Sequence, residues 1–437
     1  MDSEALARQV IAKLRGVGHQ AFLVGGCVRD LLLGVKPKDF DIATDARPDR
    51  IMDLFPRSGR VGAHFGVVLV RDVFDQVEVA TFRSDHDYMD GRHPEQVRFE
   101  SDPREDVLRR DFTVNGLMMD PDTGKVLDFV DGRGDLSRGV IRAIGDPYAR
   151  FREDHLRLLR GVRFAARLGF EIETATFDAM RRDHALILKV AMERVREELV
   201  RILTEGGARR GFELLDASSM LADLLPEVAA MKGVAQPPEY HPEGDVWRHT
   251  LLMLEQLHQP TPTLAFGALL HDVGKPPTFR VADRIRFDGH VEEGVRLAHV
   301  ILTRLRCSRE EIEQVEALID NHMRFKDVSR MKESTLKRFL RLPEFEEHLE
   351  LHRLDAISSN KRLDNYEVAK SKLEEYSAEH LQPEPLVTGA DLIGMGYQPG
   401  PQFSLILAML EDAQLEGRIR SQDEAMDLVW EMFPLEG

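Results

Sequence analysis

The chain has 437 residues, of which 43% are hydrophobic and 31% charged, and its formal net charge at pH 7 is −17. This composition excludes a disordered protein, and the length exceeds one hydrophobic core, so we expect roughly two to four domains. No apolar run approaches the roughly 18 residues that cross a bilayer, and the N-terminus lacks a signal-peptide stretch. Two distant cysteines, Cys27 and Cys307, argue against a disulfide framework and favour the cytoplasm.

Residues 1–147 mix strand and helix patterns, which predicts an α/β domain. Short runs rich in Val, Ile and Phe predict strands at 20–24, 40–43, 67–70 and 77–82. A glycine pair precedes a predicted helix at 27–33, and a proline near its start marks another helix at 48–54. From about residue 148 onward the pattern is helical almost without a break.

Prolines divide this helical part. Pro226 and the pair Pro237-Pro238 indicate one boundary, and Pro383-Glu384-Pro385 marks a linker to a C-terminal piece of one or two helices. The chain is therefore expected to be an α+β protein of four regions. They are a head at 1–147, a helical neck at 148–225, a third helical region at 226–375 and a tail at 376–437.

The first chemical motif is LVGGCVRDLLLG, in which Gly25 and Gly26 end a strand and open a helix. Without a Cβ atom the backbone can approach a triphosphate, and the helix N-terminus offers free N–H groups to the anion. Arg29, one turn into the helix, can add a charge-assisted contact. A glycine pair alone is more often a simple turn.

The second motif, KDFDIAT, follows about a dozen residues later and carries Asp39 and Asp41. On a strand, this spacing places both carboxylates on one face. Two oxygen ligands on one face suit Mg²⁺ and a two-metal, in-line attack on a phosphate. An isolated Asp-x-Asp is more often a solvated strand end, but the order of the two motifs favours a catalytic metal site.

With these motifs the sequence resembles the bacterial class II CCA-adding enzymes and their poly(A) polymerase relatives, in the polymerase-β nucleotidyltransferase superfamily. The string RRDFTVNGLMMD resembles the family's second motif, which implies nucleotide contacts from Arg110, Asp111 and Asn115. DFVDGRGD, residues 128–135, resembles the motif that links head and neck. The resemblance implies a polymerase-β-like head. Glu78 is a candidate third acidic residue, with a solvent-facing strand residue as the equal alternative.

The string FREDHLRLLRGVRF resembles the family's base-reading motif. Asp154 and Arg157 are three residues apart on a predicted helix, so we expect them to share a face. Cytosine and adenine both carry an exocyclic amine, from which a carboxylate can accept a hydrogen bond. A guanidinium can donate hydrogen bonds to ring or carbonyl acceptors. The pair could therefore admit C and A and reject U and G. Without the resemblance, such a pair would be read as a surface ion pair.

A stripe of arginines runs along the same segment and can bind RNA phosphates despite the net negative charge. It comprises Arg150, Arg152, Arg157, Arg160, Arg163 and Arg167. Arg160 and Arg163 are predicted nucleotide contacts, with packing as a comparable alternative, and Glu153 is expected to support Arg157 or the helix start. Residues 81–99 resemble the family's flexible loop and its following strand, which argues against a CC-only enzyme.

Histidines and aspartates on the later helices form an ordered set that resembles the HD metal-dependent phosphohydrolases. The set is His249, His271, Asp272, His290, His322 and Asp355. Imidazole and carboxylate ligands suit Mn²⁺, Ni²⁺, Fe²⁺ or Zn²⁺ better than Mg²⁺ alone. Lys275 could bind a substrate phosphate. Hydrolysis and a supporting role in tRNA binding both remain open.

The resemblance implies a tRNA nucleotidyltransferase that adds CCA, or the terminal A, to the tRNA 3′ end from CTP and ATP. A poly(A) polymerase is the first alternative, and an HD phosphohydrolase acting on RNA ends or nucleotides is the second. The tail string LVTGADLIGMGYQPGPQF resembles the tail of HD-containing relatives, which implies either tRNA contact or a packing module. The oligomeric state is left open.

Overall fold

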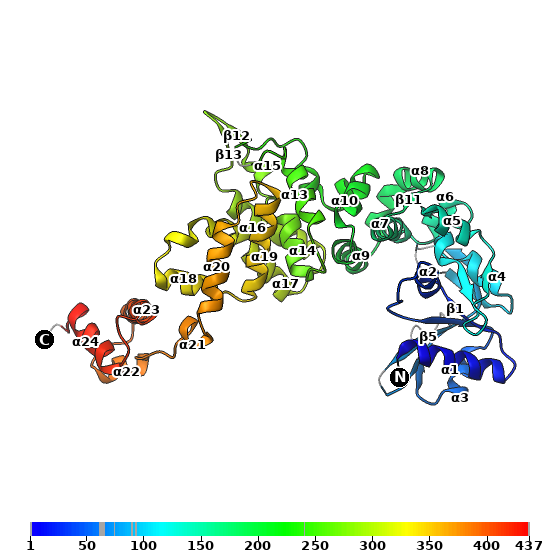
Figure 1. Cartoon of the computed structure of the whole chain (residues 1–437), viewed down its shortest axis with the longest axis horizontal. Coiled ribbons are helices and arrows are strands. Elements are labelled where there is room, and N and C mark those ends of the chain that lie inside the picture. Colours follow the sequence, from blue (N-terminus) through cyan, green and yellow to red (C-terminus); the bar gives the residue numbers. More distant parts are fainter. Residues whose placement is uncertain are drawn as a thin grey trace. The chain divides into compact units, whose positions relative to one another are not determined.

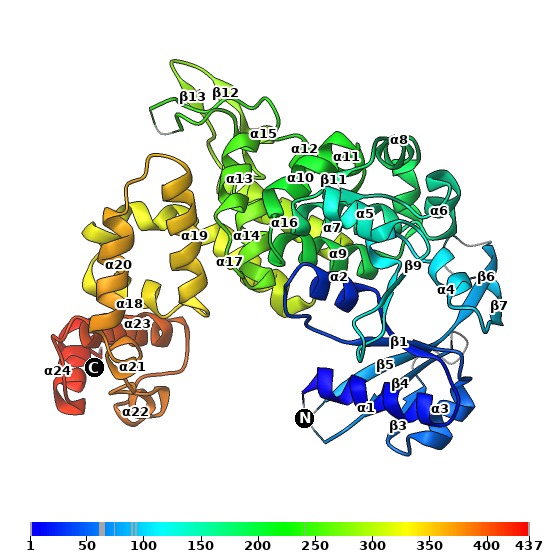
Figure 2. The ribbon, with the colours of Figure 1, turned by 45° about the vertical axis from the view of Figure 1, so that its right-hand side comes forward.

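The computed structural model of the chain describes residues 2–60, 66–73, 75–88, 91, 94–239 and 241–435. The chain divides into two compact units, drawn in Figures 1 and 2. One unit comprises Met1–Ala229 with Arg304–Arg306, and the other comprises Ala230–Thr303 with Cys307–Gly437. None of the described helices is both long and apolar enough to cross a membrane.

A seven-stranded mixed sheet forms the centre of the head, in the order β3-β4-β5-β2-β1-β8-β9. The strands are β1 (Ala21–Val24), β2 (Asp41–Thr44), β3 (Ser58–Arg60), β4 (Val67–Arg71), β5 (Gln76–Thr81), β8 (Leu117–Met119) and β9 (Val126–Asp128). Strands β2 and β5 pair in parallel, and the other neighbours are antiparallel. All four strands expected from the sequence are present, and the α+β prediction is confirmed.

Helices cover the sheet and extend the head. They are α1 (Ser3–Gly16), α2 (Gly26–Leu32), α3 (Pro48–Leu54), α4 (Pro103–Leu108) and α5 (Gly132–Arg138). Helix α1 lies against β1, β2 and β5, because Leu6, Val10 and Leu14 recur at helical spacing and are buried (Figure 2). Its start is fixed by Asp2, whose side chain accepts from the backbone N–H of Ala5.

The segment expected to be a flexible loop forms two paired strands, β6 (Arg83–Tyr88) and β7 (Pro94–Phe99). Residues 89, 90, 92 and 93 of that segment lie outside the described residues. The structure therefore shows a hairpin where the sequence predicts a loop followed by a strand.

The neck is helical, as predicted. Its helices are α6 (Pro147–Glu153), α7 (Arg157–Leu168), α8 (Thr174–Asp183), α9 (Met192–Thr204), α10 (Ala208–Ala217), α11 (Met220–Leu224) and α12 (Pro226–Ala229). Helix α7 packs against both α9 and α10. The short parallel pair β10 (Val140–Ile141) and β11 (Glu171–Ile172) joins the end of the head to the neck.

The second unit begins with a helical bundle. Its elements are α13 (Val246–Glu255), α14 (Pro262–Leu270), α15 (Lys275–Thr278), β12 (Arg280–Val281), β13 (Ile285–Arg286), α16 (His290–Arg304), α17 (Arg309–Asn321), α18 (Glu333–Leu340), α19 (Phe345–Ser358) and α20 (Asp364–Glu375). Helix α14 contacts α13, α17 and α19, and its residues from Leu264 to Leu270 are all buried. An apolar helix at the centre of a bundle needs this cover on every side.

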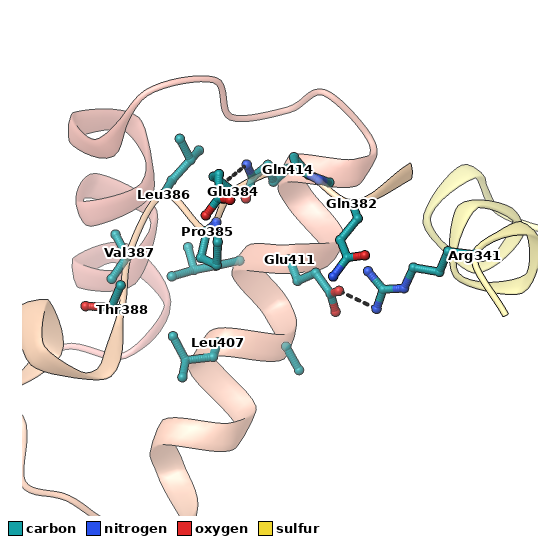
Figure 3. Close-up of a pocket in the computed structure, with 13 residues that line it drawn as sticks. Arg341, Gln382, Glu384, Pro385, Leu386, Val387, Thr388, Leu407, Glu411 and Gln414 are labelled. Atoms are coloured by element: carbon teal, nitrogen blue, oxygen red, sulfur yellow. Dashed lines mark hydrogen bonds and ion pairs between the residues drawn. The ribbon is translucent and has the colours of Figure 1, made fainter. Parts of the chain in front are cut away.

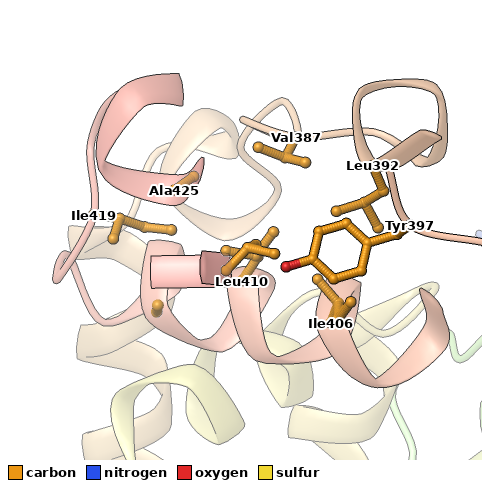
Figure 4. Packing of buried hydrophobic residues seen from close by; sticks show 9 residues of the cluster. Val387, Leu392, Tyr397, Ile406, Leu410, Ile419 and Ala425 are labelled. Carbon is orange, nitrogen blue, oxygen red and sulfur yellow. The ribbon is translucent and has the colours of Figure 1, made fainter. Parts of the chain in front are cut away.

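Among the described residues, three helices follow the linker at Pro383-Glu384-Pro385, not the one or two expected, and a fourth, α21, precedes it. They are α21 (Ala378–Leu381), α22 (Gly389–Gly394), α23 (Pro401–Leu415) and α24 (Gln422–Met432). The last three of them enclose a core of their own, part of which Figure 4 shows around Leu392, Tyr397, Ile406 and Leu410. The hydroxyl of Tyr397 donates to the carbonyl of Phe433 at 2.6 Å and closes this core.

Ion pairs attach α23 to α18. Arg341 lies 2.7 Å from Glu411, and Arg338 pairs with both Glu411 and Asp412. The ammonium of Lys337 donates to the carbonyl of Leu415 at the end of α23, at 2.6 Å. Next to this contact, residues 382–388 and α23 line a surface pocket of about 1000 Å³ (Figure 3).

Candidate functional site

The turn between β1 and α2 has the geometry that its glycines predict. Gly25 has φ 71°, which side-chain-bearing residues rarely adopt. A Cβ added to Gly25 would lie 3.0 Å from Nη1 of Arg110. The turn therefore needs glycine both for its backbone conformation and for the close approach of this arginine.

Three carboxylates lie beside this turn. Asp41 is the first residue of β2, and it pairs in register with Val24 on β1 and Glu78 on β5. Asp39 lies in the bend before β2, so the prediction that it shares a strand with Asp41 is wrong. Asp39 and Glu78 are exposed, and Asp41 is half-buried at the first residue of β2.

Asp41 is the carboxylate on which the charges of the other two act. Burial, together with the negative charges of Glu78 and Asp39, raises the pKa of Asp41 to about 6, against the opposing effect of Arg110. Carboxylates that repel one another in this way are stabilised by a bound cation, and an all-oxygen ligand set suits Mg²⁺. Glu78 is exposed on β5 and pairs in register with Asp41, which fits both expectations for it, a third acidic residue and a solvent-facing strand residue.

A buried hydrogen-bond network joins the residues of the predicted nucleotide site. Nη1 of Arg29 donates to Asn115 at 2.8 Å, and the amide of Asn115 donates to Asp111 at 3.3 Å. Arg160 on α7 donates to the other oxygen of Asp111 at 2.8 Å. Burial favours the neutral acid, but Arg160 outweighs it and lowers the pKa of Asp111 to about 2. The network thus ties the neck helix to the head.

Arg110 is held by a residue that the sequence reasoning missed. Asp106 on α4 is fully buried and accepts from Arg110 with one oxygen and from Arg109 with the other, at 2.9 and 2.7 Å. Burial raises the pKa of Asp106, but the two arginines outweigh it and lower that pKa overall. The spacing of four residues from Asp106 to Arg110 in a helical segment is the signal that could have found it.

The proposed base-reading pair does not share a helix. Helix α6 ends at Glu153, α7 begins at Arg157, and Asp154 lies between them, where its side chain accepts from the backbone N–H of Leu156 at 3.1 Å. The prediction of a common helix face is therefore wrong. Arg157 is buried and donates to Glu153 at 2.7 Å and to the carbonyl of Arg109 at 3.0 Å. Glu153 supports Arg157 as expected.

The arginine stripe of α7 is largely occupied by carboxylates. Arg163 and Glu198 on α9 are both buried, and their side chains lie 2.6 Å apart. Arg167 lies 3.5 Å from Glu205 and 3.6 Å from Asp30. Arg163 therefore fits the packing alternative better than a nucleotide contact.

The second unit brings all six predicted HD residues together. Their ligand atoms fall into two groups, each within 4.8 Å: His249, His271 and Asp355 form one, and Asp272, His290 and His322 form the other. A third group, His241 and Glu243 with His249, was missed because it precedes the motif.

Three of the histidines are oriented in the same way. The Nδ1 atoms of His271, His290 and His322 lie 3.0, 2.9 and 2.6 Å from backbone carbonyls three residues earlier. Donation from Nδ1 leaves Nε2 as the free lone pair, which is the arrangement of metal-binding histidines. Nε2 of His271 and of His290 is buried without a hydrogen-bond partner among the described residues. The donor set therefore fits a transition metal.

The charges around these histidines support the same conclusion. Despite its burial, Asp272 has its pKa lowered well below the ordinary value by His271 and Lys275. Burial lowers the pKa of His322 to about 4, which keeps the imidazole neutral. Lys275, the predicted phosphate ligand, lies 2.7 Å from Asp272 and donates to Gln236 at 2.6 Å.

A pocket of about 1040 Å³ opens onto Asp272, His290, His322 and Asp355. Cations and carboxylates line it in equal number: the cations are Lys275, Arg284, Arg286, Lys326 and Arg362, and the carboxylates are Glu239, Asp272, Asp288, Asp355 and Asp364. The cations of this lining can contact a phosphate group.

Comparison with known proteins gives matches over each region. The model of the poly A polymerase head domain matches residues 21–142, and the HD domain model matches residues 246–360. A model described as "Probable RNA and SrmB- binding site of polymerase A" matches residues 169–232.

Curated relatives match about half of the chain. The CCA-adding enzyme of Ligilactobacillus salivarius is 42% identical over 211 residues, which are 48% of this chain and 52% of the relative. That of Levilactobacillus brevis is 45% identical over 206 residues, 47% of this chain and 52% of the relative. The chain thus spans about half the length of these relatives.

Solved structures agree with the whole fold. The Bacillus stearothermophilus CCA-adding enzyme in complex with CTP superposes with TM-score 0.76 at 24% identity, covering 99% of both chains. The Thermotoga maritima CCA-adding enzyme complexed with tRNA gives TM-score 0.60 at 19% identity, covering 99% of this chain and 96% of that one. The resemblance is confirmed: this chain carries matches to the poly A polymerase head domain and to the HD domain, and it is similar to CCA-adding enzymes over about half of its length.

Proposed function

We propose that this protein is a tRNA nucleotidyltransferase that adds CCA, or the terminal A, to tRNA 3′ ends from CTP and ATP without a nucleic-acid template. The observation that carries the proposal is the group of Asp39, Asp41 and Glu78 beside the Gly25 turn, where burial and the neighbouring carboxylates raise the pKa of Asp41. The relatives named CCA-adding enzyme match over about half the chain, and solved relatives were captured with CTP, ATP and tRNA.

In this reaction the 3′-hydroxyl of the tRNA attacks the α-phosphate, and pyrophosphate leaves. Asp39 and Asp41 would hold Mg²⁺, which would activate the hydroxyl and neutralise the developing charge. Gly25 and Gly26 let the triphosphate approach the backbone, and Arg110, fixed by Asp106, faces that approach.

The base is read at the start of α7. Asp154 accepts from the exocyclic amine of C or A, and Arg157 donates to the ring. Glu153 and the carbonyl of Arg109 hold Arg157 in one orientation, and a fixed donor discriminates between bases better than a mobile one. Arg160 acts behind this pair by anchoring α7 to Asp111.

The test uses purified protein, each NTP supplied separately, and three RNAs: tRNA ending at the discriminator base, tRNA ending in CC, and unstructured RNA. We expect C addition to the first, a single A on the second, and little extension of the third. Long adenylate tails on the third RNA would instead identify a poly(A) polymerase. Addition retained by Asp39→Asn/Asp41→Asn would refute the catalytic assignment.

A second candidate activity is metal-dependent phosphate-ester hydrolysis in the HD region. It rests on the two ligand groups and on the cationic side chains in the pocket beside them. Manganese-loaded protein should hydrolyse nucleotide phosphoesters, and Asp272→Asn should lose this activity while Asp41→Asn keeps it. If the manganese-loaded protein shows no detectable hydrolysis, the HD region is left with a supporting role in tRNA binding.

The regions carry these roles as follows: nucleotidyl transfer in 1–147, base reading and RNA binding in 148–225, the HD centre in 226–375, and tRNA contact in 376–437. We propose Mg²⁺ for the head, one of Mn²⁺, Ni²⁺, Fe²⁺ or Zn²⁺ for the HD centre, and the cytoplasm as the compartment. The tail role has the least support, because that region holds eleven carboxylates against two arginines, Arg418 and Arg420.

A further inference from the structure

His249 differs from the other histidines of the HD region in how its ring is oriented. His271, His290 and His322 each place Nδ1 on a backbone carbonyl three residues earlier. Nδ1 of His249 instead lies 2.8 Å from Oε1 of Glu243, and its Nε2 lies 3.2 Å from Oδ1 of Asp355. The ring is fully buried, so carboxylates face both of its nitrogens inside the protein.

Glu243 is built into its position. Its side chain is 7% exposed, and the same Oε1 lies 2.8 Å from Nδ1 of His241 in a hydrogen bond. Its loop is fixed by Asp245, which accepts from the N–H of Arg248 at the start of α13 and from the N–H of Gly233. The other oxygen, Oε2, is buried without a hydrogen-bond partner among the described residues. A buried carboxylate with a spare oxygen is costly unless a proton donor or a cation uses it.

We propose that Glu243 is a positioning residue for the metal position formed by His249, His271 and Asp355. Its carboxylate lies against Nδ1 of His249, so that a metal bound at Nε2 leaves the ring proton on the side of Glu243 and fixes the ring toward His271 and Asp355. This inference rests on the HD region being a metal centre, as proposed above.

The geometry favours positioning over direct ligation. A neutral imidazole has one lone pair, so a metal on Nε2 leaves the proton on Nδ1, the side where Glu243 lies. A carboxylate acceptor makes a stronger hydrogen bond than the carbonyls used by the other three rings, and it makes the imidazole a more basic ligand. His241 restrains Glu243 from the far side. The first position therefore differs from the second, formed by Asp272, His290 and His322, in ligand strength.

The experiment measures Mn²⁺ binding to the full chain in an Asp39→Asn/Asp41→Asn background, so that only the HD region takes up metal. Stoichiometry and affinities are compared for Glu243→Gln, Glu243→Leu and the control Glu239→Gln, an exposed carboxylate that lines the pocket that opens onto Asp355. Circular dichroism and the metal-free Tm report folding.

We expect two Mn²⁺ in the background protein and in the Glu239→Gln control. Loss of such an outer hydrogen bond typically weakens metal binding about 10–100-fold. Glu243→Leu should weaken one site toward the upper end of that range and spare the other. Glu243→Gln keeps an acceptor oxygen, so it should restore most of the lost affinity.

Three outcomes would overturn the inference. Unchanged affinities in Glu243→Leu would show that Glu243 does not act on the metal position. Equal weakening of both sites with a lowered Tm in both Glu243 variants would show a structural role. Three Mn²⁺ in the background protein and two in Glu243→Leu would make Glu243 a ligand. Absence of any Mn²⁺ in the background protein would instead refute the metal centre itself.

Discussion

Replacing Asp41 by asparagine should stabilise the metal-free protein while abolishing nucleotide addition. Burial and the charges of Glu78 and Asp39 raise the pKa of Asp41 from its ordinary value of 3.8 to about 6. A raised carboxylate pKa means that ionisation opposes folding. The penalty is fully present above the folded pKa and disappears as the pH falls below the unfolded value. An asparagine side chain at this position carries no charge and avoids the penalty.

The size of the effect follows from the shift. About two pKa units correspond to about 3 kcal/mol at 1.36 kcal/mol per unit. Asp41 is half-buried, so solvent screening reduces the expected gain to about 1–2 kcal/mol. That gain corresponds to roughly 2–8 °C in Tm for a unit of this size. At pH 5 the linkage relation leaves about half of it.

The assay is urea unfolding of the EDTA-treated wild type and Asp41→Asn at pH 8 and pH 5, with nucleotide addition measured separately. Asp53→Asn, an exposed carboxylate on α3, is the matched control and should change stability little. Mg²⁺ should stabilise the wild type more than Asp41→Asn. A variant that is no more stable than the wild type at pH 8, or equally stabilised at both pH values, would refute the repulsion argument.

Three further predictions address other parts of the chain. Asp111→Asn should destabilise the first unit by about 2 kcal/mol at pH 7, because Arg160 holds the pKa of Asp111 near 2. This loss of stability should shrink below pH 4, where the ion pair no longer stabilises the wild type. A loss that does not depend on pH in urea unfolding would contradict the prediction. Gly274→Ala would place a Cβ 2.0 Å from the carbonyl oxygen of His290. The Mn²⁺ affinity should therefore fall roughly tenfold or more, while nucleotide addition persists. Unchanged Mn²⁺ binding in a metal titration would show that α16 can shift freely. Tyr397→Phe removes the hydrogen bond that closes the tail core at a cost of about 1 kcal/mol, and hydrogen exchange across α24 should accelerate without change elsewhere.

The features predicted well from the sequence are those that short motifs specify locally. The Gly25 turn needs a backbone conformation that glycine adopts readily, and the HD residues lie on or beside helices whose order along the chain is fixed. The strands of the head follow from short β-branched runs between turn signals. In these cases neighbouring residues carry both the conformation and the chemistry.

The features missed depend on contacts between distant segments or on an unmarked helix break. No glycine or proline separates Glu153 from Arg157, so the sequence predicts one helix where the structure has two. Whether Arg163 binds phosphate or packs is decided by Glu198, which is 35 residues away. The strand prediction for Asp39 failed at a boundary, where sequence patterns are least informative.

Different interactions stabilise the contact between α18 and α23 and the interior of the tail. Arg338 and Arg341 meet Glu411 in partly exposed ion pairs, whereas the tail core is apolar and enclosed by its own helices. Added salt screens the first interaction within a Debye length of about 10 Å at 0.1 M and leaves the second intact. We therefore expect rising ionic strength to loosen the attachment of α23 to α18, which the hydrogen bond from Lys337 to the carbonyl of Leu415 still maintains, before it affects the tail core.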